Sequence, residues 1–215
     1  MRITGGQARG RRLFGPPGRK VAIRPTGDRV REAIFAILGS RTVGSSVLDL
    51  FAGTGALGIE ALSRGASQAV FVDRSRLALN IVAANLEHCL PGTSWKLFRL
   101  DLDRPTALEK LSRLLPPQTT FDLIFLDPPY EKKLAEKTLS MVDNATILSA
   151  TGLVVVEEQA SQVLPDSLDR LRLTDRRRYG ETGIWIYQPH SLVQRPPCHS
   201  LPRTTPSPRK DPHHP

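Results

Sequence analysis

The sequence predicts an α/β fold built on a doubly wound, mostly parallel sheet with helices on both faces. Three observations lead to this prediction. From residue 47 onward, short apolar runs alternate with amphipathic stretches of helical period. A glycine-rich turn directly follows the first apolar run. The length of 215 residues, with 40% hydrophobic residues, suits one domain with a substantial core.

The first 27 residues are predicted to form a basic arm ahead of this domain. Short apolar positions alternate there with glycine and arginine, and Gly15-Pro16-Pro17-Gly18 indicates a tight turn, so we expect a small β-hairpin. Residues 24–27 should form a loop, because the residue before a proline avoids helical geometry. Asp28 is then expected to cap a helix from about Arg29 to Leu38. The main domain is predicted to span residues 28–188.

Apolar runs bounded by turn residues mark the strands of the main domain. Five are expected to lie parallel, at 47–50, 69–73, 95–100, 122–127 and 152–157. Two more, at about 170–174 and 184–187, are expected to pair in antiparallel fashion at the sheet edge. Helical periodicity places the connecting helices near 57–64, 75–88, 105–115 and 134–148.

Charge is distributed unevenly along the chain. The formal net charge is +9, and residues 1–31 carry nine Arg or Lys against one acid, whereas residues 32–171 carry 13 bases against 17 acids. A basic arm on a mildly acidic body is better explained by a polyanionic partner than by solubility alone. We therefore expect the partner to be a nucleic acid.

The remaining composition excludes several classes of protein. Residues 189–215 hold 8 of the 18 prolines and almost no apolar periodicity, so they are predicted to be a disordered tail. No stretch approaches the ~20 apolar residues of a membrane span, and the basic N-terminus lacks the apolar segment of a secretory signal. Two distant cysteines indicate neither a disulfide framework nor a zinc site. We expect a cytoplasmic monomer without a membrane partner.

The segment from Asp49 to Gly58, DLFAGTGALG, contains the candidate cofactor site. Gly53, Gly55 and Gly58 have the GxGxxG spacing, in which glycines let a ligand approach the backbone. An acid, Asp73, ends the next strand about 20 residues later, where it would accept hydrogen bonds from both hydroxyls of a ribose. The segment therefore predicts a nucleoside site; the alternative for Asp73 is an unrelated surface acid.

Asp49 narrows the choice of nucleoside. A carboxylate at this turn would repel a pyrophosphate but tolerate a cationic ligand, which favours S-adenosylmethionine with its sulfonium and amino groups. Asp101 is expected to meet the adenine amino group, with Asp103 as the alternative, and either could instead only cap the next helix. The residues expected to bind the cofactor are Asp49, Phe51, Ala52, Gly53, Thr54, Gly55, Gly58, Asp73, Arg74, Asp101 and Leu102.

Residues 121–130, FDLIFLDPPY, predict a buried strand that ends in the candidate catalytic residues. The apolar run 123–126 suits a central strand, which must stop at Asp127 because the next two residues are prolines without an N–H. Asp127, the Pro128 carbonyl and the Tyr130 ring would then meet at the carboxyl edge of the sheet. Two acceptors and a stacking surface suit an amino-bearing nucleobase, whereas a plain strand–turn junction is the alternative.

From Met1 to about Gln188 the chain resembles the RsmD-type 16S rRNA (guanine(966)-N2)-methyltransferases, within the class I SAM-dependent methyltransferase superfamily. DPPY is shared with adenine-N6 DNA methyltransferases, so the segment from Arg24 to Leu38 and the RYG pattern separate this group. The resemblance rests on Arg2-Ile3, Gly5-Gly6, Arg9-Gly10-Arg11, RPTGDRVREAIFAIL at 24–38, DLFAGTGALGIEALSRGA at 49–66, DPPY at 127–130, VVVEE at 154–158, and Arg178-Tyr179-Gly180 with Tyr187.

The resemblance implies a seven-stranded, Rossmann-like sheet and a substrate of 16S rRNA or the small ribosomal subunit. The expected reaction transfers a methyl group from S-adenosylmethionine to N2 of a guanine, number 966 by resemblance. Asp127 and the Pro128 carbonyl would accept hydrogen bonds from the two N–H groups of the amine. An ordinary carboxylate would suffice to receive the proton that the methylated amine releases. Within the Asp127-Pro128-Pro129-Tyr130 motif, Tyr130 would stack on the base.

Basic residues of the arm and of the helix after it are expected to contact RNA phosphates. The candidates are Arg9, Arg11, Arg12, Arg24, Arg29, Arg31 and Arg178, joined by Arg176 and Arg177 if the chain end folds back near the site. Two other functions stay open at this point. The same fold could methylate DNA adenine, or the protein could be a non-catalytic rRNA-binding assembly factor. The intact DPPY and Gly53-Thr54-Gly55 argue against the latter.

Overall fold

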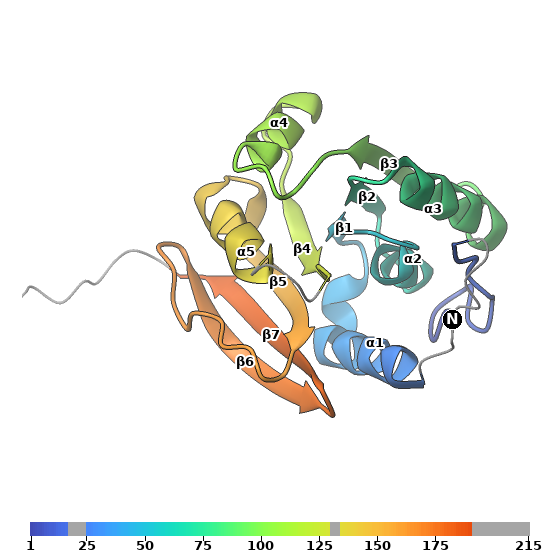
Figure 1. The fold of residues 1–215 in the computed structure, drawn as a ribbon. Helices are drawn as coiled ribbons and strands as arrows, with labels where there is room; N and C mark the ends of the chain where they lie inside the picture. Colours follow the sequence, from blue (N-terminus) through green and yellow to red (C-terminus); the bar gives the residue numbers. More distant parts are fainter. Residues whose placement is uncertain (17–24, 130–133, 191–215) are drawn as a thin grey trace, which may run out of the picture.

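A computed structural model of the chain describes residues 1–16, 25–129 and 134–190, and shows one seven-stranded sheet in the order β3-β2-β1-β4-β5-β7-β6 (Figure 1). The predicted fold class is confirmed. The strands are β1 (Ser46–Leu50), β2 (Gln68–Asp73), β3 (Ser94–Arg99), β4 (Phe121–Leu126), β5 (Leu148–Gln159), β6 (Leu171–Tyr179) and β7 (Thr182–Pro189). The helices are α1 (Pro25–Leu38), α2 (Ala56–Ser63), α3 (Arg76–Cys89), α4 (Ala107–Leu114) and α5 (Leu134–Asn144), with a 3-10 turn, η1 (Gly39–Thr42).

The chain order reverses between β1 and β4, which sit side by side in the middle of the sheet. Both pair in parallel, with Asp49 opposite Phe125 and Leu50 opposite Leu126. β1 then leads outward through β2 to β3, whereas β4 leads outward through β5 in the other direction. Such a switch point opens a crevice at the carboxyl ends of the strands. The fold therefore places the ends of β1 and β4 at the expected ligand site.

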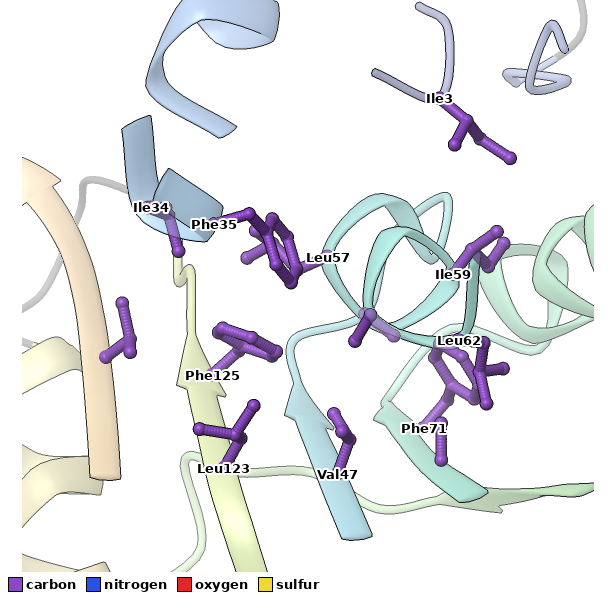
Figure 2. Packing of buried hydrophobic residues seen from close by; sticks show 14 of the residues in the cluster. Ile3, Ile34, Phe35, Val47, Leu57, Ile59, Leu62, Phe71, Leu123 and Phe125 are labelled. Atoms are coloured by element: carbon purple, nitrogen blue, oxygen red, sulfur yellow. The ribbon is translucent and has the colours of Figure 1, made fainter. Parts of the chain in front are cut away.

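Two apolar cores lie on opposite faces of the sheet. α1, α2 and α3 cover one face, where Phe35 of α1 and Phe125 of β4 pack with ring centroids 5.7 Å apart (Figure 2). α4 and α5 cover the other face, around Leu111 and Leu139. Each fully buried side chain of this kind stabilises the fold by about 1.5–3 kcal/mol relative to exposure. Burial on both faces explains the near-continuous apolar runs of β1, β2 and β4.

The antiparallel edge is longer than the sequence analysis predicted. β7 lies between β5 and β6, and its pairing continues from Thr182 to Pro189. β6 forms the outer edge, where Arg176, Arg177 and Arg178 are exposed. Charged side chains on an edge strand oppose unwanted pairing with other chains. Arg176 also lies over the ring of Trp185, with its guanidinium carbon 5.0 Å from the ring centroid.

Two predicted helix boundaries are wrong. α1 begins at Pro25 rather than near Arg29, because a proline in the first turn loses no intrahelical hydrogen bond. Asp28 is consequently inside the first turn, where it pairs with Arg31 instead of capping the helix. α5 ends at Asn144 rather than 148, because Ile147 and Leu148 join the sheet beside Phe121.

The N-terminal arm is fastened to the domain rather than standing apart from it. Ile3, Ala8 and Leu13 are buried in the apolar cluster of α1, α2 and α3, with Ile3 on the side of α2 away from the strands (Figure 2). The hairpin closes through an antiparallel bridge between Arg2 and Arg12, and its turn is near residues 6–10. The tight turn predicted at Gly15-Pro16-Pro17-Gly18 stays a prediction, because residues 17 and 18 lie outside the described part. The predicted tail, residues 189–215, begins too early, because Pro189 ends β7 and His190 N donates to the Arg170 carbonyl at 2.8 Å. Residues 191–215 lie outside the described part.

A buried carboxylate, Glu60 of α2, holds the arm in place. It accepts hydrogen bonds from the backbone N–H groups of Thr4 and Gly5, at 2.8 and 2.7 Å. It also forms ion pairs with Arg31 of α1 and with Arg64, the residue that follows α2. A buried charge is tolerated only when it is paired and hydrogen-bonded, as here. Within the described ranges, no helix is both long and apolar enough to cross a membrane.

Candidate active site

Two cavities meet at the carboxyl ends of β1 and β4. The first, of about 250 Å³, is lined by residues that follow β1, β2, β3 and β4, and the second, of about 290 Å³, extends from the same glycine turn toward α1 and the end of β5. Phe51, Gly53 and Asp127 line both cavities. Together the two reach the size of an ordinary small-molecule site. We call them the β2–β3 cavity and the α1–β5 cavity.

The glycines of the turn have different roles. Gly53 lines both cavities, and a side chain added there would meet only Phe51 O at 3.8 Å, so its backbone is open to a ligand. A side chain at Gly58 would collide with the Phe71 ring at 2.3 Å, and one at Gly55 would lie 2.9 Å from Ile59. The spacing therefore reflects ligand access at Gly53 but close packing at Gly55 and Gly58. Phe51 adopts a left-handed φ of 66°, an uncommon conformation for a non-glycine residue.

Asp49 is buried beneath the turn and lines the α1–β5 cavity. Its Oδ2 accepts a 2.9 Å hydrogen bond from the Gly58 backbone at the start of α2. Burial raises the pKa of Asp49 well above 3.8, and the charges of Asp127 and Asp73 raise it further, although the Gly58 hydrogen bond opposes them. A cation in the cavity would favour the ionised carboxylate. That electrostatic demand agrees with the predicted cationic ligand.

Asp73 lies at the end of β2, where the sequence predicted a ribose acceptor. Its Oδ2 accepts a hydrogen bond from Gly53 N at 2.9 Å, and its Oδ1 accepts one from Ser75 N at 2.7 Å. These two bonds fix the carboxylate against the glycine turn while it lines the β2–β3 cavity. Each carboxylate oxygen has a second lone pair, so both can still accept from a diol.

The acids after β3 both line the β2–β3 cavity and are held differently. Asp101 accepts from Asp103 N at 3.2 Å and lies 3.7 Å from Arg104. Asp103 pairs with Lys137 of α5 at 2.7 Å. Neither caps α4, whose N-cap is Thr106 without a side-chain hydrogen bond. Leu102 and Arg74 also line this cavity, as expected for cofactor contacts.

Asp127 follows β4 and faces both cavities. It is open to solvent through them, yet the protein packed around its carboxyl group and the charge of Glu158 raise its pKa from 3.8 to about 7. The sequence analysis expected an ordinary carboxylate, so its proton affinity was underestimated. Pro128 is buried, and Pro129 lines the β2–β3 cavity. Tyr130 lies outside the described residues, so its stacking role stays a prediction.

The structure divides the predicted RNA-contact arginines. Arg9, Arg12, Arg29 and Arg178 are exposed. Arg11 donates to the carbonyls of His88 and Cys89, at 2.9 and 3.1 Å, and thereby caps α3. Arg24 lies outside the described residues. The prediction that Arg31 contacts RNA is wrong, because its side chain is 4% exposed and paired with Glu60 and Asp28.

Sequence reasoning also missed two acids at the end of β5. Glu157 lines the α1–β5 cavity, and Glu158 is buried beside Asp127. A signal was available, since VVVEE places two consecutive acids at the carboxyl end of a predicted parallel strand. A third cavity of about 740 Å³ lies between α4 and α5, and its described lining includes Glu109 and Glu136 but none of the predicted site residues. We therefore assign no chemistry to it.

The residues around the linked cavities fit S-adenosylmethionine. Carboxylates from β1, β2 and β4 surround the glycine turn, where a polyphosphate would be repelled and a sulfonium would be attracted. Gly53 leaves the backbone open, and the fixed Asp73 offers acceptors to a diol. This sheet order, glycine turn and set of acids define an S-adenosylmethionine-dependent, class I methyltransferase.

The chain belongs to the family described as Conserved hypothetical protein 95, whose family model matches residues 1–188. It is 38% identical over 188 residues to the Bacillus subtilis protein YlbH, covering 87% of this chain and 98% of YlbH. It is 34% identical over 190 residues to the Escherichia coli protein named Ribosomal RNA small subunit methyltransferase D, covering 87% of this chain and 89% of that protein. The solved structure of Escherichia coli yhhF matches with a TM-score of 0.72 and 33% identity, covering 88% and 97% of the two chains.

Proposed function

We propose that this protein transfers a methyl group from S-adenosylmethionine to the exocyclic N2 of a guanine in small-subunit ribosomal RNA. The observation that supports this most is the carboxylate of Asp127, which opens into both cavities beside the glycine turn. The name of the Escherichia coli relative supports the choice of RNA. Guanine 966 is the position that the resemblance to the family suggests.

The donor would supply an electrophilic methyl group on a sulfonium. Asp73 would hold its ribose, Asp101 its adenine, and Asp49 its positive groups, all from rigid strand ends. Gly53 would let it lie against the backbone. The donor would then lie across the glycine turn, with its adenosine in the β2–β3 cavity and its positive groups near Asp49 in the α1–β5 cavity. The part of the α1–β5 cavity beyond Asp127, toward α1 and the end of β5, would receive the base.

Asp127 and the Pro128 carbonyl would each accept a hydrogen bond from one N–H group of the guanine amine. Both acceptors favour the pyramidal nitrogen that attack on the methyl group requires, because the lone pair must leave conjugation with the ring. Asp127 would then receive the amine proton as the new C–N bond forms and the C–S bond of the donor breaks, which leaves S-adenosylhomocysteine. A pKa of about 7 makes Asp127 a better proton acceptor than an ordinary aspartate. Tyr130 would stack on the flipped base, a contact worth roughly 1–3 kcal/mol.

The test is a labelled-methyl assay on the purified chain. Small-subunit rRNA, assembled small subunits and duplex DNA are supplied separately, and the modified nucleoside and its position are identified by mass spectrometry. We expect N2-methylguanine in the rRNA or subunit arms. Asp127→Asn should lower transfer by about 10²-fold or more while S-adenosylhomocysteine still binds. N6-methyladenine in DNA, or no transfer despite donor binding, would contradict the proposal.

A further inference from the structure

Glu157 and Asp127 leave neighbouring strands at the same level. The last pair in the β4–β5 ladder is Leu126 with Val156, so the next residue on each strand is an acid. Adjacent strands lie about 4.8 Å apart, which keeps the two carboxylates within reach of one small ligand. Both line the α1–β5 cavity.

The alternation of the strands explains why Glu157, and not Glu158, reaches this cavity. Phe125 and Val155 are partners, and both point into the core beneath α1 and α2. Two residues later, Asp127 and Glu157 project from the same face. Glu158 is not among the described lining residues; it is 5% exposed and accepts a 2.8 Å hydrogen bond from Gln159 N.

The backbone of Glu157 is firmly held. β5 pairs with β4 on one side and with β7 on the other, where Glu157 is opposite Ile184. A side chain on a central strand can position an acceptor more accurately than one on a loop. Glu157 is half-buried, so its carboxylate is partly desolvated at the cavity wall.

The cavity has an acidic lining. Of the described residues in the lining, Asp49, Asp127 and Glu157 contribute carboxylates and Arg31 contributes a guanidinium. Arg31 is already shared among Glu60, Asp28 and the Arg2 carbonyl. Among the described residues of the lining, carboxylates therefore outnumber cationic groups.

Guanine satisfies such a wall along one edge. Its Watson–Crick edge carries the N2 amine and, beside it, the N1–H, so two donors point the same way. Adenine carries an amine beside an N1 lone pair, which a carboxylate repels. We propose that Glu157 determines specificity for guanine by accepting the N1–H while Asp127 accepts from the N2 amine. This inference rests on the proposed function and extends it to how the base is selected.

The experiment exchanges the one group that Glu157 would read. 2-Aminopurine keeps the amine at position 2 but replaces the N1–H with a lone pair. Synthetic RNA hairpins spanning the mapped position carry either guanine or 2-aminopurine there, and kcat/KM is measured for wild type, Glu157→Gln and Glu157→Asp. Glu109→Gln, an exposed carboxylate on α4, is the matched control.

Wild type and the control should prefer guanine over 2-aminopurine by about 10- to 100-fold, the range of a good base-edge contact. Glu157→Gln should lower kcat/KM for guanine about tenfold. It should also reduce the preference for guanine over 2-aminopurine at least fivefold, because its amide N–H can donate to the N1 lone pair of 2-aminopurine. Glu157→Asp keeps the charge and should keep the preference at reduced rate. Affinity for S-adenosylhomocysteine should stay within about twofold in all variants.

Four outcomes would overturn the inference. An unchanged preference in a folded Glu157→Gln shows that Glu157 does not read the base. Weakened S-adenosylhomocysteine binding with an unchanged preference assigns Glu157 to the amino group of the donor. If wild type methylates no guanine in rRNA, the proposed function fails and this inference fails with it. If wild type methylates guanine efficiently but methylates 2-aminopurine equally well, the inference alone fails.

Discussion

The guanidinium Nε of Arg31 lies 3.2 Å from Oε2 of Glu60, and both side chains are buried. This pair joins α1 to α2, and the same carboxylate accepts from the arm backbone at Thr4 and Gly5. Arg31 also lines the α1–β5 cavity. The pair therefore links the position of the arm to one wall of the candidate site.

Removing the carboxylate should destabilise the whole domain. Glu60→Ala leaves Thr4 N and Gly5 N without their acceptor and removes one of the partners of Arg31, which keeps Asp28 and the Arg2 carbonyl. Breaking a buried ion pair from one side costs about 3–5 kcal/mol. Urea denaturation should show this loss in the free energy of unfolding. Glu32→Ala, on the exposed face of α1, should change it by less than about 0.5 kcal/mol. If Glu60→Ala lowered the free energy of unfolding by less than about 1 kcal/mol, the contacts of Glu60 would not be needed to hold the domain together.

Methyl transfer should depend on pH through Asp127. Only the ionised carboxylate can accept the amine proton, so kcat/KM should rise about tenfold per unit below pH 7 and level off above it. Glu158→Gln removes the negative neighbour that raises this pKa, so the rising limb should move to lower pH. Rate profiles from about pH 5 to pH 9 for both proteins test this. A limb at the same pH in both would exclude Asp127 as the titrating group.

The stability of Asp49→Asn relative to wild type should increase as pH rises. The pKa of Asp49 is raised by burial, so its contribution to folding is fully present below its ordinary value of 3.8 and is lost as pH rises toward the raised value. An amide does not titrate, and its oxygen can still accept from Gly58 N. The stability advantage of Asp49→Asn over wild type should therefore grow between about pH 4 and pH 8, whereas exposed Glu87→Gln should show no such trend. A constant difference would contradict the raised pKa.

Asp73→Asn should weaken donor binding without unfolding the turn. Its amide oxygen can replace the acceptor for Gly53 N, but the charge that would hold a diol is gone. Charge-assisted hydrogen bonds contribute about 1.5–3 kcal/mol, so the Kd for S-adenosylhomocysteine should rise roughly 10- to 100-fold by calorimetry. If this variant bound S-adenosylhomocysteine as tightly as wild type, the ribose contact would not be Asp73.

Exposed arginines of the arm and α1 should govern the salt dependence of RNA binding. Changing Arg9, Arg12 and Arg29 to Gln should flatten the slope of log K against log salt by about 2, since each phosphate contact contributes roughly 0.7–0.9. The matched control changes Arg104, Lys110 and Arg113, which lie on or near α4 on the other face of the sheet. Equal flattening in both variants would mean that net charge alone matters and the arm does not bind.

Local sequence patterns determined the fold class and most of the site. Strands buried on both faces need continuous apolar runs, and prolines after Asp127 must end a ladder, so these features are legible without coordinates. The same patterns located Asp49, Gly53, Asp73, Asp101 and Asp127 at strand ends that do line the cavities.

Only the tertiary structure decided which charges are free and which are held. Arg29 and Arg31 are two residues apart in one basic segment, yet Arg31 is buried against Glu60, 29 residues away. Likewise, the raised pKa of Asp127 depends on Glu158 of the neighbouring strand, and Glu157 reaches the cavity because β5 pairs with β4 in one register. Burial and pairing between distant segments set these properties, and local periodicity does not encode them.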